Sequence, residues 1–173
     1  MREIWELAKE RLTSEELKNK VLLRTDLEGW NAWHCGTCRG VVDVMREIWE
    51  LAKERLTTEE IRNEMLLRTD CEVWNGWHIA SFEGEVDAMW EICEMAIESL
   101  TSEEIKNEML LRTDSEGWNV WHKAAKRGNL DAMRVIWNLA KEELTTEQIK
   151  NEYFYVLTVR EGTFGTFHHL GAT

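Results

Sequence analysis

Proline is absent from this sequence of 173 residues, and its uninterrupted apolar segments are short. No segment approaches the roughly 18 consecutive apolar residues that a helix needs to cross a bilayer. The N-terminal stretch MREIWELAKERL is charged and amphipathic, and it lacks the apolar centre of a secretory signal. We therefore expect neither a membrane-spanning segment nor a signal for export.

Basic residues are also scarce. Lysine and arginine together number 21, against 33 aspartates and glutamates, and the formal net charge is −12. A protein that binds the phosphate backbone of nucleic acids needs dense positive charge, and so does one that adheres to an anionic membrane surface. The composition therefore predicts no nucleic-acid partner and no membrane partner.

Cysteine occurs only four times, at positions 35, 38, 71 and 93. Four cysteines in a chain of this length do not indicate a disulfide scaffold, and we expect an intracellular, cytoplasmic protein in a reducing setting. The sequence also lacks a glycine-rich phosphate loop, a Ser–His–Asp set and a pair of carboxylates suited to acid–base catalysis. We expect no enzymatic activity, no cofactor, no bound metal and no small-molecule substrate.

Tryptophan, by contrast, is abundant, with ten residues, and the sequence repeats itself. The segment MREIWELAKERLT occurs at Met1 and again, unchanged, at Met45. Related segments begin at Met89 and Met133, so the step is 44 residues each time. A fixed period of this length indicates an array of one structural unit.

The period divides the chain into repeats of a single array. We place a partial repeat at 1–25, full repeats at 26–69, 70–113 and 114–157, and a degenerate partial repeat at 158–173. Internal repeats need a neighbour on each side, and both ends of the chain fall inside a unit. We therefore expect the chain to be part of a longer array.

The segment WHCGTCRG contains a C-x-x-C motif, formed by Cys35 and Cys38. Such a pair is typical of thiol–disulfide chemistry, and with His34 it could ligate zinc. The other units carry WHIASFEG and WHKAAKRG in the same register, so neither cysteine recurs. We favour a packed side chain beside a surface thiol, and a redox or zinc-binding module remains the alternative.

Each full unit predicts three helices. In the third unit the first helix spans 119–128, with an asparagine suited to N-capping in front and a glycine at the end. The second helix spans 129–144, and its apolar residues recur at helical spacing, which predicts a stripe facing the core. These residues are Leu130, Met133, Ile136, Trp137 and Ala140.

The third helix is predicted after a capping box, Thr-x-x-Glu or Thr-x-x-Gln, whose two side chains satisfy the free amides at a helix start. The pairs are Thr13 with Glu16, Thr57 with Glu60, Thr101 with Glu104, and Thr145 with Gln148. In the third helix of the second unit, Ile105, Met109 and Leu110 should form a buried edge. One unit cannot bury its apolar face alone, so stacked units are expected.

The segment Asp114 to Gly128, DSEGWNVWHKAAKRG, resembles the ankyrin repeat, whose pattern is D-x-x-G-x-T-P-L-H-x-A-A-x-x-G. The matching residues are Asp114, Gly117, His122, Ala124, Ala125 and Gly128. The departures are Trp121 for Leu, Asn119 for Thr and Val120 for Pro in this unit, Val73 for Gly in the second, and Gly36 and Thr37 for two Ala in the first.

The resemblance implies an all-α, ankyrin-like helical repeat solenoid with stacked helix pairs. Ankyrin units repeat at about 33 residues, and the additional residues here hold the extra short helix of each repeat. A HEAT-like or armadillo-like stack has a fitting period but lacks this pattern of glycine and histidine. It is the alternative architecture.

The same resemblance assigns structural roles to two residue types. The histidine of each unit, at positions 34, 78 and 122, is expected to bond neighbouring backbone and tie adjacent turns together, rather than to form a metal ladder. Two rows of tryptophan are expected in the core. They are Trp33, Trp77 and Trp121 in the first helices, and Trp5, Trp49 and Trp137 in the second helices.

Ankyrin proteins contact partners through the turn tips and the ends of the first helices. The residues at these places differ among the units, while the residues of the repeat pattern barely do. A third row of tryptophan precedes the first helices, where it could face the binding groove or pack on the added third helix. The candidate contact residues are Leu27, Glu28, Trp30, Arg39, Glu72, Trp74, Phe82, Glu83, Ser115, Glu116, Trp118, Lys126 and Arg127.

These features together predict a non-catalytic scaffold for protein–protein interaction. Its acidic charge should favour a protein partner with a basic patch. Two other functions stay open at this point. One is the thiol redox or zinc-binding module at Cys35 and Cys38, and the other is a purely architectural array that spaces other domains.

Overall fold

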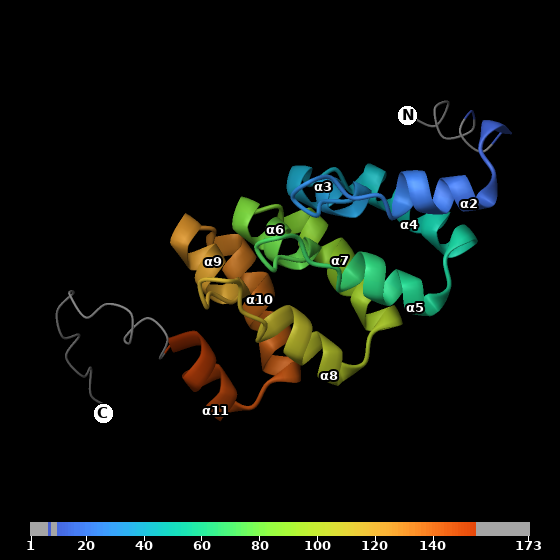
Figure 1. Ribbon diagram of the computed structural model, residues 1–173. Coiled ribbons are helices and arrows are strands. Elements are labelled where there is room, and N and C mark those ends of the chain that lie inside the picture. Colours follow the sequence, from blue (N-terminus) through green and yellow to red (C-terminus); the bar gives the residue numbers. More distant parts are fainter. Residues whose placement is uncertain (1–6, 8–9, 155–173) are drawn as a thin grey trace, which may run out of the picture.

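The computed structural model describes residue 7 and residues 10–154, which form ten α-helices, four π-helical segments and no strand (Figure 1). The prediction of an all-α protein is thus confirmed for this part of the chain. Within it, no helix is both long and apolar enough to span a bilayer. The degenerate repeat at 158–173 and Trp5 lie outside the described residues.

The first helix of each unit is bounded by the residues that the sequence indicates. These helices are α3 (Ala32–Arg39), α6 (Gly76–Glu83) and α9 (Val120–Arg127). An asparagine side chain precedes each of them and accepts a hydrogen bond from the amide of the third helical residue. Each ends at a glycine with positive φ, between 60° and 80°, which stops the helix without steric cost.

The second helices are α4 (Val42–Arg55), α7 (Val86–Ser99) and α10 (Leu130–Glu143). The predicted core stripe of α10 is buried at Ile136 and Ala140 and half-buried at Met133 and Trp137. The prediction for Leu130 is wrong, because 59% of this residue is exposed. It belongs to the last described helix pair, so no following pair among the described residues covers it.

The third helices begin at α2 (Ser14–Glu16), α5 (Thr58–Ile61), α8 (Ser102–Glu104) and α11 (Thr146–Ile149). All four start with the predicted capping box. Each then changes to a π-helical segment, which the sequence did not predict. These segments are η1 (Leu17–Leu22), η2 (Arg62–Leu66), η3 (Ile105–Leu110) and η4 (Lys150–Phe154).

The π-helical geometry explains the spacing of the buried residues in η3. In a π-helix the hydrogen bonds join residues five apart, as between the amide of Leu111 and the carbonyl of Lys106 at 2.9 Å. Residues at i, i+4 and i+5 then lie along one side of the segment. Ile105, Met109 and Leu110 have this spacing, and all three are at most 3% exposed, as predicted.

Successive units pack side by side along the chain. Helix α3 contacts α6, which contacts α9, and the second helices α4, α7 and α10 follow the same order (Figure 1). The segments η1, η2 and η3 each pack against the helix pair that comes after them, as η2 does against α6 and α7. The fold therefore consists of helix pairs with an extra helix between consecutive pairs.

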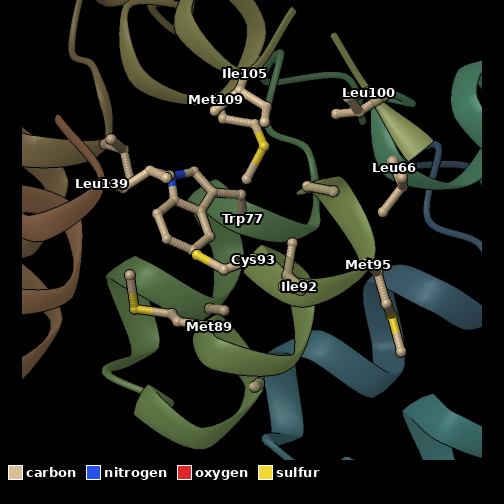
Figure 2. Close-up of a cluster of buried hydrophobic side chains, with 14 of the residues drawn as sticks. Leu66, Trp77, Met89, Ile92, Cys93, Met95, Leu100, Ile105, Met109 and Leu139 are labelled. Carbon is tan, nitrogen blue, oxygen red and sulfur yellow. The ribbon is translucent and has the colours of Figure 1, made fainter. Parts of the chain in front are cut away.

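One apolar core runs through the described units. Trp33 and Trp77 are 1% exposed and Trp49 is 5% exposed, as predicted for core tryptophans, whereas Trp121 and Trp137 of the last pair are half-buried. Figure 2 shows how the middle of this core is built around Trp77, with side chains from helices of different units converging on its ring. They include Met89 and Cys93 from α7, Met109 from η3 and Leu139 from α10.

Candidate functional site

The turns that precede the first helices are shaped by one aspartate each. In every turn the Oδ1 atom of this aspartate accepts hydrogen bonds from the backbone amides two and four residues later, at 2.8–2.9 Å. The three residues are Asp26, Asp70 and Asp114. Because the bonds are local to each turn, the backbone of a tip does not depend on the side chains that the tip exposes.

Consecutive turn tips lie directly beside each other. The amide of Cys71 donates a hydrogen bond to the carbonyl of Glu28 at 2.9 Å. At Gly29, whose φ is +86°, an added Cβ atom would lie only 3.2 Å from the Cα atom of Asp70. Glycine therefore serves two purposes there, because it adopts the left-handed conformation and allows the two backbones to approach closely.

The predicted contact residues at the tips are solvent-exposed. Leu27 is fully exposed, and Glu28, Glu72, Ser115 and Glu116 are exposed as well. The three glutamates recur at the same position of successive turns and form an acidic row along the tips. Between neighbouring tips, the hydroxyl of Ser115 donates a hydrogen bond to the Glu72 carboxylate at 3.2 Å.

The predicted residues at the ends of the first helices are also accessible. Arg39, Glu83 and Arg127 are exposed, and Phe82 is half-buried. Arg127 lies 3.3 Å from the Glu83 carboxylate, and its guanidinium carbon lies 4.3 Å from the centre of the Phe82 ring. The structure thus brings the ends of α6 and α9 together into one mixed surface.

The remaining predicted contact residue, Lys126, is exposed and lies in the same unit as Trp118. Its ammonium group is 5.1 Å from the centre of the Trp118 ring and 4.0 Å from the Glu116 carboxylate. Lys126 therefore links the end of α9 to the turn in front of this helix. At such exposed positions an ion pair contributes little to stability, so both charges remain accessible to a partner.

The third row of tryptophan lies between the tips and the first helices. Trp30, Trp74 and Trp118 are all half-buried. The ring of Trp74 packs edge-on against Phe82 with centroids 5.0 Å apart, and the Trp118 ring packs on the His122 ring at 5.9 Å. These rings therefore contact the first helices of their own units, and each keeps part of its surface open to solvent.

Two of these tryptophans also contact the following unit. The indole nitrogen of Trp30 donates to Oδ2 of Asp70 at 2.9 Å. Trp74 lies under the ammonium group of Lys123, 4.1 Å from the ring centre, a cation–π arrangement that desolvation strengthens. The row thus connects adjacent units as well as offering an apolar surface.

Lys123 and Asp114 form a buried ion pair that the sequence analysis did not predict. Lys123 is 4% exposed and Asp114 is 6% exposed. Burial alone raises the pKa of the Asp114 carboxyl, but hydrogen bonds from Lys123 and from backbone amides outweigh this effect, so the pKa lies below its ordinary value. The sequence did offer one indication of this ion pair, because Lys123 stands where the preceding unit has the apolar Ile79.

His34 and His78 bond backbone next to the following turn, as predicted, whereas Nε2 of His122 has no such partner among the described residues. The Nε2 atom of His34 lies 3.1 Å from the carbonyl oxygen of Arg68, and Nε2 of His78 lies 3.3 Å from that of Arg112. A carbonyl only accepts, so this nitrogen donates. Burial lowers the pKa of both imidazoles, to about 4 for His78, and keeps them neutral.

The C-x-x-C pair has the wrong environment for an activated thiol. Cys35 is exposed and Cys38 is half-buried on α3, and both are free. Burial, followed by the charge of Glu83, raises the pKa of the Cys38 thiol, whereas thiol–disulfide chemistry requires a lowered pKa. His34 is already engaged with backbone, and the described residues contain no group of three His, Cys, Asp or Glu side chains arranged to hold a metal ion.

Comparisons with known proteins identify the fold but no family. No protein-family model matches the chain, and no curated protein matches it. Among solved structures, it resembles a chain in the crystal structure of the yeast ribosomal protein Rps3 in complex with its chaperone Yar1. The TM-score is 0.61 at 14% sequence identity, and the match covers 77% of this chain and 79% of the other chain.

Proposed function

We propose that the chain is an ankyrin-type helical repeat array that serves as a non-catalytic scaffold for protein–protein interaction. The partner binds along the turn tips and the ends of the first helices. The repeat pattern at 114–128, the glycine and asparagine caps and the histidine bonds to backbone support the ankyrin assignment. The regular order in which each helix pair contacts the next supports a solenoid.

The observation that carries this proposal is the exposure of variable side chains on a rigid frame. Leu27, Cys71 and Ser115 occupy the same position of successive turns, and all are exposed. The aspartate of each turn and the backbone bond between neighbouring tips fix the positions of these side chains. Preorganised contact groups lose little entropy on binding, which favours recognition of an irregular partner surface.

The charge of the surface indicates the kind of partner. Glu28, Glu72 and Glu116 present one exposed carboxylate per unit, on a chain with a net charge of −12. A basic patch on a protein partner matches this row. Rim charges of this kind act mainly on the rate of association, which should fall as salt concentration rises.

The structural neighbour is consistent with this proposal at the level of fold. That neighbour is a chain in a complex of a ribosomal protein with its chaperone, so a fold of this kind occurs in a protein–protein assembly. A redox or zinc function at Cys35 and Cys38 is less well supported, because the pKa of Cys38 is raised. A purely architectural array remains the competing function, and it predicts no partner at the tips.

Charge reversal along the acidic row tests the proposal. In the variant Glu28→Lys/Glu72→Lys/Glu116→Lys, we expect recovery of the partner from an extract of the source cells to fall by about tenfold, as for loss of an interface hot spot. The matched control reverses Glu15, Glu59 and Glu103, which recur at the same interval in the third helices. Partner recovery equal to wild type in the tip variant would exclude this surface.

A further inference from the structure

Helix α7 exposes two large apolar side chains that the other second helices do not have. Trp90 is 48% exposed and Ile97 is 62% exposed. They lie seven residues apart, on one face of the helix. At the position of Trp90 the neighbouring units carry arginine, Arg46 and Arg134, and at the position of Ile97 they carry lysine. The apolar character is therefore specific to this one unit.

A third change in α7 opens a hollow beside these residues. The flanking units have Trp49 and Trp137 where α7 has Cys93. Those tryptophans pack on the core tryptophan of their own unit, with ring centroids 5.9 Å apart in both cases. In the middle unit the smaller thiol of Cys93 takes the place of that indole beside Trp77 (Figure 2). The bulk of one indole ring is missing there.

The hollow is a groove between α7 and α10. Its volume is about 450 Å³, and we call it the α7–α10 groove. Its apolar lining consists of Trp90, Cys93 and Ile97 from α7 and Val135 and Leu139 from α10, and Lys141 and Glu142 of α10 are charged residues at its border. All three unit-specific replacements thus border the same hollow, which lies on the second helices and away from the turn tips and first helices.

The charge on the α7 side of the groove is acidic, whereas α10 contributes one residue of each sign, Lys141 and Glu142, to the lining. Helix α7 contains four acidic residues, Asp87, Glu91, Glu94 and Glu98, and no basic residue. Helices α4 and α10 each contain basic residues, including those at the positions of Trp90 and Ile97. Among the α7 carboxylates, Glu91 is paired with Arg46 of the preceding unit at 2.7 Å. The other three are exposed.

From these features we propose that the α7–α10 groove binds an amphipathic, basic helix of a second protein. An apolar side chain of this helix fills the hollow beside Cys93, and further apolar residues at helical spacing contact Trp90 and Ile97. Lysine or arginine residues on its flanks face the carboxylates of α7. A second copy of this chain fits less well, because it would bring its own acidic α7 against these carboxylates.

The test uses a fluorescein-labelled model peptide of leucine and lysine with its leucines at helical spacing. A length of roughly 18 residues suffices for a stable helix. A second peptide has glutamate in place of every lysine. Fluorescence anisotropy measures Kd for wild type and for two variants without charge change, Trp90→Ala/Ile97→Ala and Cys93→Trp. The latter restores the residue that both flanking units have.

The matched control is Val41→Ala/Leu130→Ala. It removes two other exposed apolar side chains, which are 44% and 59% exposed in wild type, and it leaves the α7–α10 groove intact. Circular dichroism melting establishes that each variant is folded. Sedimentation velocity over a range of concentrations reports self-association of wild type and of the Trp90→Ala/Ile97→Ala variant.

We expect both groove variants to raise Kd for the basic peptide by at least about tenfold, equivalent to about 1.4 kcal/mol. The control should bind as wild type does, and the acidic peptide should bind at least tenfold more weakly than the basic one. Equal binding of the basic peptide to wild type and to Trp90→Ala/Ile97→Ala would overturn the proposal. So would self-association that this variant abolishes, because a second copy would then occupy the groove.

Discussion

The indole nitrogen of Trp30 donates a hydrogen bond to Oδ2 of Asp70, 2.9 Å away in the next unit. The other oxygen of the same carboxylate accepts hydrogen bonds from the amides of Glu72 and Trp74. One side chain therefore shapes its own turn and fixes the tryptophan of the preceding unit. The spacing between neighbouring turn tips depends on this shared carboxylate.

Replacing Asp70 by alanine should therefore cost more stability than the same change at Asp26. Asp26 makes the same two backbone bonds within its turn, so the difference between the variants isolates the bond from Trp30. We expect a difference of about 1.5 kcal/mol in the free energy of unfolding, typical of a hydrogen bond to a charged group. Urea denaturation measures it. Equal losses would show that the bond does not couple the two units.

Val73 has a φ of +67°, in the region that β-branched residues avoid. The flanking units have Gly29 and Gly117 at this position. We expect Val73→Gly to raise the free energy of unfolding by about 1 kcal/mol through relief of backbone strain. The converse change, Gly117→Val, should lower it by about 1–2 kcal/mol.

Gly117 provides a clean control for this comparison, because no atom lies within 4 Å of a Cβ added there. Any loss in Gly117→Val then comes from the backbone conformation alone. Thermal or urea unfolding of both variants shows whether each change raises or lowers the free energy of unfolding. If Gly117→Val stabilised the protein, or Val73→Gly destabilised it, the backbone of Val73 would not be strained as proposed.

Most helix boundaries could be predicted because local rules decide them. The capping boxes, the asparagine before each first helix and the glycine after it satisfy backbone groups within a few residues. The histidine bonds followed from the resemblance to ankyrin repeats. The identity of the exposed tip residues followed from their variation among units, although no sequence pattern indicated the contact between Arg127 and Phe82.

Features that depend on several units together were not predicted. The π-helical segments are rare in proteins, and no local motif distinguishes Ile105–Leu110 from an α-helix. The exposure of Leu130 depends on what packs beside the last helix pair. The α7–α10 groove arises from three replacements in one copy. Comparison of Trp90 with Arg46 and Arg134 would have located it.

Acidification should destabilise the fold through its buried histidines. Burial lowers the pKa of His78 from 6.5 to about 4, so below pH 6.5 the unfolded chain binds a proton that the folded chain does not. Stability is therefore full above about pH 6.5 and falls as the pH drops toward 4. We expect His78 to contribute a loss of about 2 kcal/mol between pH 7 and pH 5.

Urea unfolding of wild type and of His78→Gln at both pH values measures this contribution. Glutamine does not titrate, so the variant should show a smaller loss on acidification, even if it is less stable at pH 7. If wild type and His78→Gln lost the same free energy of unfolding between pH 7 and pH 5, then His78 would be protonated in the folded protein at pH 5, against this account. The lowered pKa of His34 predicts the same direction for that residue.

The cysteines should behave as structural thiols. Burial raises the pKa of Cys93 to about 12, so a maleimide at pH 7 should modify it only after unfolding, whereas the exposed Cys35 and Cys71 should react in the native state. Mass spectrometry of the labelled protein identifies the modified residues. We also expect the double variant Cys35→Ser/Cys38→Ser to melt at the wild-type temperature with or without zinc. A zinc-dependent rise in wild type alone would support the metal-binding alternative.

The central claim is that a protein partner binds the turn tips and the ends of the first helices. Hydroxyl-radical footprinting of the chain, alone and in complex with its recovered partner, tests this most directly. We predict protection at Leu27, at the tips around Glu72 and Glu116, and at Phe82, with no change on the exposed faces of the third helices. Protection confined to the third helices, with the tips as reactive as in the free chain, would contradict the claim.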